Sequence, residues 1–447
     1  MPARRAPMVF PVEMLSRELD GKLLLALCAK ERGWRSIIGG LDEVNDLVHR
    51  FEPCVYFAKS ARSSNAQLFA RLRCLGHQVI VLDEEALVRH DNIFLMKHER
   101  NAFKNVDLLL TWGEDSREMW LRSGFIDDLP VAAVGNPRID MLAPQLRPYH
   151  QESIASIRSR FGNFVLFNSN FGMVNNTVTG GVRFNLARWT AGGRGEKDSV
   201  GYLAHKHQVF ERFCVLIPKL AAAISPCNLV IRPHPNEDHT AWKSAVAGAP
   251  NAHVIFEGSV VPWIAAARVL VHNGCTSAVE AAVVGTPVVT YRPVTSEFDN
   301  ALANSMGIEC CTDEGLLSAV GKTLAESRHS LSASQMDLLR HHVAFADGSM
   351  CSNAILDAIE RTPVGMAERG IPLHRWLNIY LQHHRELLPK RLRKLSRGSK
   401  RNAYKKLKFS GLNEEMITSR IGQLAKVLSR FSGIQAHETG KNLVELK

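Results

Sequence analysis

The sequence predicts an α/β protein built from two doubly wound parallel sheets, and three observations support this prediction. Short apolar runs alternate with helical stretches along most of the chain, as in parallel sheets whose strands are connected by helices. The runs carry almost no charge, which is typical of strands that are buried on both faces. At 447 residues the chain is longer than a single hydrophobic core usually supports, so we expect two domains.

The first series of predicted elements occupies residues 1–148. It opens with an apolar run at Met8–Val12, and a helical pattern follows from Ser16, a suitable N-cap, to Gly33, a suitable stop. Pro144–Pro148 has the composition of a connection between domains. The other strand-like runs of this series are Ser36–Ile38, Val55–Ala58, Val79–Leu82, Leu108–Thr111 and Val131–Val134.

The second series occupies residues 149–345 and is expected to form a second domain of the same class. The remaining region, 346–447, is predicted to be a helical and increasingly basic C-terminal extension. In doubly wound sheets ligands bind at the carboxyl ends of the strands, so polar residues directly after each run are candidates for a site. The strand-like runs of the second series are Phe164–Phe167, Leu229–Ile231, Val254–Phe256, Val269–His272 and Val288–Tyr291.

One strand–turn–helix–strand unit, residues 269–291, carries the clearest ligand signal. The turn from Gly274 to Thr276 and Ser277 places backbone N–H groups and two hydroxyls at a helix N-terminus, where a phosphate is well accommodated. Glu280, the only charged residue of the unit, would lie within reach of a ribose hydroxyl. Ser277 and Glu280 equally fit a capping box that satisfies the helix's own backbone, so both interpretations stay open.

Two further strand ends carry charged groups that could act on a substrate. Arg232 and His234 lie in a loop stiffened by two prolines and suit a phosphate, although a merely hydrogen-bonded loop histidine is the alternative. Asp83, Glu84 and Glu85 follow another strand, where a carboxylate could serve as general base or nucleophile in glycosyl transfer, or complement a helix dipole. Other residues expected in a substrate cleft are Lys59, Asn136, Arg138, Asn168 and Asn170.

The excess positive charge of the chain is local. The formal net charge is +11, and residues 390–408 contain ten lysine and arginine residues with no acidic residue. This basic segment is expected to bind an anionic surface such as a membrane leaflet, although a solvated helix face would carry the same charges. Its single aromatic residue, Tyr404, gives no stacking platform, so no nucleic-acid partner is expected. The segment opens with Lys390, Arg391, Arg393 and Lys394.

Other features of the composition exclude some classes of protein. The longest apolar runs fall well short of the roughly 20 residues that span a bilayer, and no signal peptide is recognisable. The nine cysteines show no metal-like spacing, which suits a reduced compartment. We therefore expect a cytoplasmic protein, at most peripheral at the inner face of the membrane, with no obligatory metal or cofactor.

The order of these motifs resembles that of bacterial surface-carbohydrate biosynthesis proteins. This group is similar to glycosyltransferases of the GT-B architecture, including the retaining β-Kdo transferases of capsule synthesis, and to teichoic-acid glycerophosphotransferases, which use CDP-glycerol. The resemblance implies two Rossmann-like domains that face a cleft, with a nucleotide sugar in the C-terminal one. The motifs are Arg17-Glu18-Leu19, Asp83-Glu84-Glu85, Gly135-Asn136-Pro137-Arg138-Ile139-Asp140, Arg232-Pro233-His234-Pro235, the 269–291 unit and Lys408-Phe409-Ser410-Gly411-Leu412.

The resemblance also implies a glycosyltransferase of capsule or lipopolysaccharide assembly. Its donor would be a CMP-linked, Kdo-like sugar, with UDP- and CDP-linked donors as alternatives, and its acceptor a glycan or a lipid-linked glycan. Arg232 and His234 would hold the donor phosphate, Thr276 and Ser277 would cap it, and Glu280 would bind the ribose. A nucleotide-sugar epimerase, a glycerophosphotransferase and a non-catalytic binding protein are the other functions that the sequence leaves open.

Overall fold

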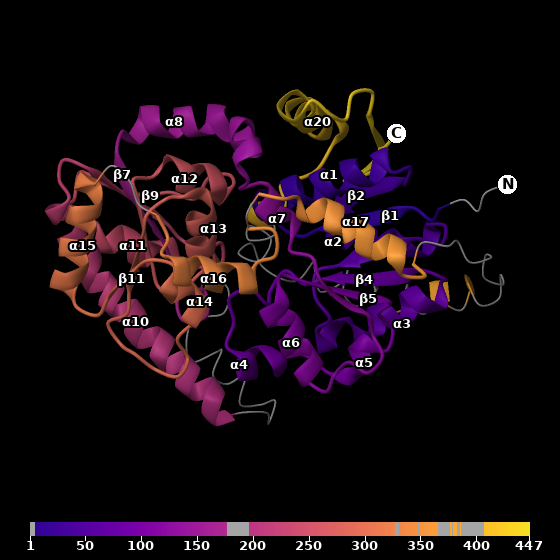
Figure 1. Ribbon diagram of the computed structural model, residues 1–447, viewed down its shortest axis with the longest axis horizontal. Helices are drawn as coiled ribbons and strands as arrows, with labels where there is room; N and C mark the ends of the chain where they lie inside the picture. Colours follow the sequence, from indigo (N-terminus) through magenta and orange to yellow (C-terminus); the bar gives the residue numbers. More distant parts are fainter. Residues whose placement is uncertain are drawn as a thin grey trace. The chain divides into compact units, whose positions relative to one another are not determined.

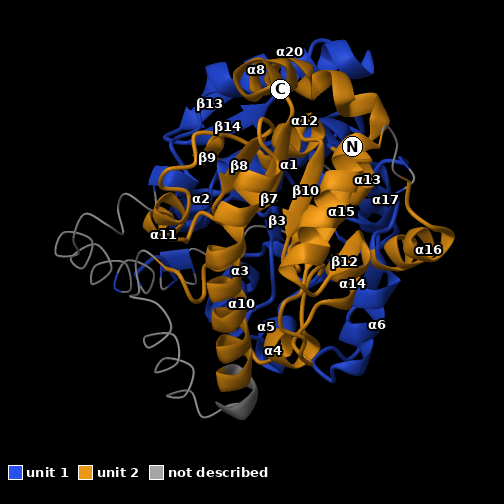
Figure 2. Cartoon of the chain, turned by 90° about the vertical axis from the view of Figure 1, so that its left-hand side faces the viewer, with its two compact units in different colours: residues 1–86, 97–141, 343–447 blue, residues 87–96, 142–342 orange. Residues whose placement is uncertain are grey.

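The protein is described from a computed structural model (Figure 1). The described residues are 5–176, 196–326, 330–346, 348–364, 376–377, 379–381, 385 and 406–447, with the backbone only for 196–199. The predicted anionic-surface residues Lys390, Arg391, Arg393 and Lys394 lie outside them. Figure 2 shows the two compact units of the chain, which are Met1–Ala86, Lys97–Met141 and Val343–Lys447 for unit 1, and Leu87–Met96 and Leu142–His342 for unit 2.

Unit 1 is built on an eight-stranded sheet in the order β13-β14-β2-β1-β3-β4-β5-β6. The helix after β1, α1 (Leu15–Glu31), has Met14 as its N-cap, so Ser16 is not the cap that the sequence suggested, whereas Gly33 follows the helix with a φ of +82°. Six strands run parallel and confirm the predicted runs to within two residues: β1 (Met8–Val12), β2 (Ser36–Gly40), β3 (Val55–Ala58), β4 (Gln78–Leu82), β5 (Leu108–Thr111) and β6 (Val131–Ala133).

The C-terminal region completes this sheet. β13 (Ala436–Gly440) and β14 (Leu443–Leu446) form a hairpin, and β14 pairs antiparallel with β2. The expected helical extension is therefore wrong at its end, although α17 (Cys351–Arg361) and α20 (Glu414–Leu428) are helices. β13 is short, charged and half-exposed, as an edge strand often is, so it leaves little apolar pattern in the sequence. The other α-helices of unit 1 are α2 (Leu41–Leu47), α3 (Ala66–Cys74), α5 (Arg100–Phe103), α6 (Glu114–Arg122) and α7 (Pro137–Asp140).

Unit 2 is built on a six-stranded parallel sheet in the order β12-β11-β10-β7-β8-β9. The predicted run at Val254–Phe256 is displaced, because β9 is Ala252–Val254, and the edge strand β12 (Ile308–Cys310) was not predicted. The remaining strands confirm the prediction: β7 (Phe164–Asn168), β8 (Asn228–Arg232), β10 (Val269–His272) and β11 (Val288–Tyr291). The α-helices are α4 (Asp91–Leu95), α8 (Gln151–Phe161), α10 (Glu196–Ala223), α11 (His239–Ala245), α12 (Val260–Ala266), α13 (Thr276–Val284), α14 (Ala301–Ser305), α15 (Asp313–Ala325) and α16 (Ala333–His342).

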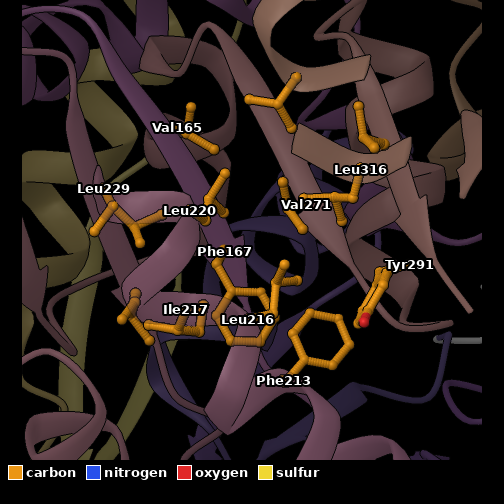
Figure 3. Packing of buried hydrophobic residues seen from close by; sticks show 14 of the residues in the cluster. Val165, Phe167, Phe213, Leu216, Ile217, Leu220, Leu229, Val271, Tyr291 and Leu316 are labelled. Carbon is orange, nitrogen blue, oxygen red and sulfur yellow. The ribbon is translucent and has the colours of Figure 1, made fainter. Parts of the chain in front are cut away.

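The core of unit 2 packs helices on both faces of the sheet. On one face, Phe167 of β7 stacks on Phe213 of α10 with ring centroids 4.7 Å apart, and Leu316 of α15 joins the same buried cluster (Figure 3). Side chains alternate along a strand, so Phe164 points the other way and meets Trp263 of α12 at 6.3 Å. Alternate residues of each strand therefore pack against the helix layers on opposite faces of the sheet.

Each sheet has one point where the strand order reverses. In unit 1 this switch point lies between β1 and β3, and in unit 2 it lies between β7 and β10. Ligands of doubly wound proteins bind outside the carboxyl ends of the strands at such a point. The residues at these two strand ends are therefore the places to look for a site in each unit.

Candidate functional site

At the switch point of unit 1, charged residues follow both strands. Glu13, after β1, forms an ion pair with Lys59, after β3, and its other oxygen lies 2.8 Å from Nζ of Lys408. Burial alone would raise the pKa of Glu13, but the two lysines outweigh burial and lower this pKa to about 2. Glu13 is thus an ionised carboxylate that binds two ammonium groups, a role that its sequence context did not reveal.

A buried triad lies beside this pair. Nζ of Lys22 on α1 lies 2.9 Å from Oε2 of Glu18, 3.0 Å from Oε1 of Glu84 and 2.7 Å from the carbonyl oxygen of Pro11. Burial opposes the charge of Lys22, but the two carboxylates raise its pKa above the usual range; burial opposes the charge of Glu18 as well, and Lys22 lowers that pKa. Glu84 is therefore held in a buried ion pair.

The other two predicted catalytic carboxylates differ from each other. Asp83 is buried, and its oxygens accept from the backbone N–H groups of Glu85 (3.0 Å) and Ala86 (3.2 Å) and from Nε1 of Trp120 (3.0 Å). Glu85 keeps 22% of its side-chain surface exposed, forms an ion pair with Arg62 and lies 3.7 Å from Nζ of Lys59. Asp83 thus stabilises the turn, and Glu85 is the most accessible of the three carboxylates.

The Gly-Asn-Pro-Arg-Ile-Asp motif joins two parts of unit 1. Asn136 is the N-cap of α7, where its side chain accepts from the backbone N–H of Arg138 at 3.0 Å. Asp140 accepts from the backbone N–H groups of Cys351 (2.6 Å) and Ser352 (2.9 Å), so it caps α17. Gly135 has a φ of +75°, and a Cβ there would clash with Sγ of Cys351. The motif therefore fixes the returning C-terminal chain.

Arg138 itself is half-buried, with its guanidinium 5.6 Å from the ring centroid of Trp112. This cation–π contact holds the side chain within unit 1. The assignment of Asn136 and Arg138 to a substrate cleft remains a prediction from the sequence.

In unit 2, four polar residues form a row at the ends of neighbouring strands. The register pairs Arg232 with Asn168 across β8 and β7, and His272 with Thr290 across β10 and β11. β7 and β10 pair through Phe167 and Val271, which places Asn168 beside His272. The row Arg232–Asn168–His272–Thr290 therefore crosses the switch point on one face of the sheet.

Three members of this row form hydrogen bonds with neighbouring residues. Arg232 donates to the carbonyl oxygens of Glu257 (2.7 Å) and Gly258 (3.2 Å), and burial lowers its pKa to about 10. His272 accepts the backbone N–H of Gly274 at Nδ1 (2.9 Å), so Nε2 donates to Thr290 Oγ1 (2.8 Å). The guanidinium of Arg232 thus shapes the loop after β9, and His272 fixes the turn that leads into α13.

The fourth member, Asn168, is different. It is 6% exposed, and its Oδ1 is buried with no hydrogen-bond partner among the described residues. Both carboxamide atoms of Asn273, directly after β10, are also buried without a partner among the described residues. The same holds for Oδ1 of Asn304. A buried polar atom normally has a partner, so this cluster at the switch point is a place where a ligand would complete the hydrogen bonding.

The turn into α13 has no side-chain cap from its N-cap residue. The N-cap of α13 is Cys275, which makes no side-chain capping bond, so the capping box based on Ser277 is not formed. Oγ of Ser277 instead lies 2.5 Å from Sγ of Cys275, Gly274 takes a φ of +79°, and Glu280 is buried in the helix. No capping hydrogen bond from the N-cap side chain is formed at this helix N-terminus, whose backbone N–H groups are the donors that a phosphate site uses.

His234 follows β8 and is held by a carboxylate that the sequence did not single out. The buried Glu237 accepts from the backbone N–H groups of His234 (3.1 Å) and Phe171 (2.9 Å), from Oγ of Ser169 (2.7 Å) and from Nε1 of Trp242 (2.8 Å). This carboxylate fixes the loop after β7, which includes the half-buried Asn170, to the loop after β8. One residue, Asn236, separates Glu237 from Arg-Pro-His-Pro, and that proximity was the available signal.

Two further observations limit the chemistry. Within the described ranges, no group of three or more His, Cys, Asp or Glu side chains is arranged to hold a metal ion. No helix in the described part of the chain is long and apolar enough to cross a bilayer.

No protein-family model matches this chain, and no curated protein matches its sequence. Solved structures do resemble its fold. UDP-GlcNAc 2-epimerase from Neisseria meningitidis, bound to UDP-GlcNAc, is 13% identical, with 80% of this chain and 100% of that chain covered and a TM-score of 0.50. The corresponding epimerase from Methanocaldococcus jannaschii, in complex with UDP-GlcNAc and UDP, is 11% identical, with 79% and 99% covered and a TM-score of 0.50.

A variant of the wall teichoic acid polymerase TagF is 11% identical, with 80% of this chain and 88% of that chain covered and a TM-score of 0.51. At such identities the similarity concerns the fold alone. The protein is an α/β protein with two Rossmann-like units of the GT-B type, and the predicted fold class is confirmed.

Proposed function

We propose that the protein is a glycosyltransferase of surface-polysaccharide assembly whose sugar comes from a nucleotide-linked donor bound in unit 2. The observation that carries this proposal is the buried Oδ1 of Asn168 at the switch point between β7 and β10, which has no hydrogen-bond partner among the described residues. A buried polar group without a partner costs about 1–3 kcal/mol. A ligand hydroxyl or amine that donates to Asn168 would remove this cost.

The donor phosphate would bind at the N-terminus of α13, next to Thr276 and Ser277, with the ribose at Glu280. His234 would contribute Nε2 as a donor, because its Nδ1 accepts the backbone N–H of Asn236 at 3.2 Å. The positive charge of Arg232 would attract the phosphate, and its hydrogen bonds to Glu257 and Gly258 would fix the loop after β9. The charge of Arg232 and the Nε2–H of the neutral His234 would stabilise the phosphate as it leaves, without an obligatory metal or other cofactor.

Unit 1 would supply the acceptor site and the reactive carboxylate. Of Asp83, Glu84 and Glu85, we assign the role of general base or nucleophile to Glu85, because it is the most accessible and the other two are engaged in the fold. Lys59 would bind the glycan or lipid-linked acceptor, whose class follows from the resemblance of the sequence motifs.

A CMP-linked, Kdo-like donor is our first choice, again from the sequence motifs. A UDP-linked donor is the direct competitor, because the epimerases that share this fold are described with UDP-GlcNAc. For the same reason a nucleotide-sugar epimerase is the second candidate function. The two differ in product: a transferase releases nucleotide and extends an acceptor, whereas an epimerase converts its nucleotide sugar to an isomer with no acceptor present.

The decisive experiment combines binding and turnover. Melting temperatures would be measured with CMP, CDP, UDP and GDP, since a ligand at 100 times its Kd should stabilise the fold by about 2.7 kcal/mol. Asn168→Ala should abolish the shift in melting temperature, whereas Asn163→Ala, at the exposed residue directly before β7, should keep it. Products from CMP-Kdo and UDP-GlcNAc would then be analysed with and without a glycan acceptor. The proposal would be contradicted if none of the four nucleotides raised the melting temperature above that of the protein alone.

A further inference from the structure

A histidine that the sequence did not single out is oriented by a carboxylate in unit 2. His205 on α10 is 7% exposed, and its Nε2 lies 3.3 Å from Oδ1 of Asp299 in the loop after β11. Oδ2 of Asp299 accepts from Arg292 at Nη2 (2.7 Å) and Nε (3.2 Å) and from the backbone N–H of Ser296 (3.1 Å). Asp299 is therefore fixed on one side and orients the imidazole on the other.

The second ring nitrogen of His205, Nδ1, makes no hydrogen bond within the described structure. Nδ1 is buried and has no hydrogen-bond partner among the described residues. Because Nε2 faces a carboxylate, the proton of the neutral ring lies on Nε2, and Nδ1 either accepts a hydrogen bond or, in the imidazolium form, donates one. A group from a ligand would satisfy it in either form.

His205 lies beside the turn that leads into α13. Asn300 follows Asp299 in the chain, and its Cβ is 4.0 Å from the position that a Cβ on Gly274 would occupy. Oδ1 of Asn304, also buried and unpartnered among the described residues, is 3.2 Å from the same position. The Asp299–His205 pair is thus adjacent to the backbone that we assign to the phosphate.

We infer that His205 is a ligand-binding residue, which as an imidazolium held by Asp299 donates a hydrogen bond from Nδ1 to a phosphate oxygen of the nucleotide at α13. The inference rests on the proposed function for the nucleotide and names the part of the ligand that His205 contacts. Both partners of the pair lie in unit 2, and the new contact needs no other unit.

The charges around His205 make binding and protonation interdependent. Asp299 faces it from the β11–α14 loop and pairs with Arg292, which also pairs with Glu309 at 2.6 Å. Lys206 is the next residue on α10, and the ring of His90 packs against Phe298 with centroids 5.3 Å apart. The carboxylates of Asp299 and Glu309 are matched by the cations of Arg292 and Lys206, so the ligand phosphate adds the negative charge that favours the imidazolium. Nucleotide binding should therefore take up a proton at His205.

Calorimetry of the full chain tests this. CMP, or UDP if CMP does not bind, would be titrated at pH 7.5 in two buffers of different ionisation enthalpy, which gives the number of protons taken up. We expect His205→Gln to lower proton uptake and to weaken the affinity about ten- to a hundredfold, because a charge-assisted hydrogen bond is lost. His207→Gln is the matched control, since His207 lies on the same helix with 42% of its side chain exposed.

The outcomes separate the two proposals. Absence of binding by the wild type to all four nucleotides would overturn the proposed function and this inference with it. Binding with the same affinity and the same proton uptake in His205→Gln would overturn the role of His205 alone. If the variant does not fold, nitrogen NMR of the wild type decides: the Nδ1 resonance should move to the imidazolium position when nucleotide is added, and an unchanged resonance would refute the inference.

Discussion

The carboxylate of Glu237 accepts a hydrogen bond from the backbone N–H of His234 at 3.1 Å. Because it also accepts from Ser169 and Phe171, it links the loop after β7 to the loop after β8. Burial raises the pKa of Glu237, and its hydrogen bonds, all from donors, act against that effect. The loop geometry around Asn168 and His234 thus depends on a single side chain that would not itself touch the ligand.

Glu237→Gln should therefore weaken nucleotide binding as well as stability. The amide would point an NH₂ group at partners that are all donors, so a loss of about 1–3 kcal/mol of folding free energy is expected. Urea unfolding and nucleotide titration measure the two effects. Glu211→Gln, with an exposed carboxylate on α10, is the control; equal behaviour of both variants would show that Glu237 does not position the loops.

Glu85→Gln should abolish sugar transfer and leave the Kd of the nucleotide nearly unchanged, because the role proposed for this carboxylate is in the transition state and Glu85 lies outside the unit assigned to the nucleotide. Steady-state kcat and nucleotide titration check this. Glu118→Gln on α6 should behave as wild type. A Glu85→Gln enzyme that keeps wild-type kcat would remove Glu85 from the mechanism.

Lys22→Met should destabilise the fold by about 3–5 kcal/mol, because it leaves the buried Glu18 and Glu84 without their cation. The deficit should shrink as the pH falls, since burial without Lys22 raises the pKa of Glu18 and the carboxylate can then be neutralised. Urea unfolding at pH 7 and pH 5 measures both effects. A deficit that is the same at both pH values would speak against a charge effect.

His272 should make stability depend on pH. Burial, followed by the charge of Lys206, lowers the pKa of His272 to about 3, whereas in the unfolded chain the imidazole has its ordinary pKa of 6.5. The unfolded state binds more protons between these values, so stability is full above about pH 6.5 and falls as the pH drops toward 3. His272→Gln should lose less unfolding free energy than the wild type between pH 7 and pH 5, and an equal loss would disprove this assignment.

The basic segment remains a prediction of the sequence. The full chain should sediment with anionic vesicles at low salt, and 1 M salt should release it because the Debye length falls to about 3 Å. Changing Lys390, Arg391, Arg393 and Lys394 to glutamine should release it as well. Equal sedimentation of this variant, or sedimentation with neutral lipid, would exclude the segment as an anchor.

The sequence predicted the strands well because buried parallel strands are apolar without interruption, as at Val269–His272 and Leu108–Thr111. It missed the edge strands β12 and β13, which contain exposed or charged residues, and it also missed β14, in a region that was predicted to be helical. Within the candidate site, Asn168 and the α13 turn were found from their places after strands. His205 could not be found, since its partner Asp299 is brought to it only by the fold, and Glu237 was missed although it lies close to Arg-Pro-His-Pro in the sequence.

The division of the chain also bears on how it folds during synthesis. The long segment of unit 2, Leu142–His342, leaves the ribosome before the segment Val343–Lys447, which supplies β14 and α17 to unit 1. During translation the unit 2 sheet can form while the sheet begun at β1 still has the β2 edge uncovered. Premature termination after residue 342 would therefore release a nascent chain with one finished Rossmann-like unit and one exposed, aggregation-prone strand edge.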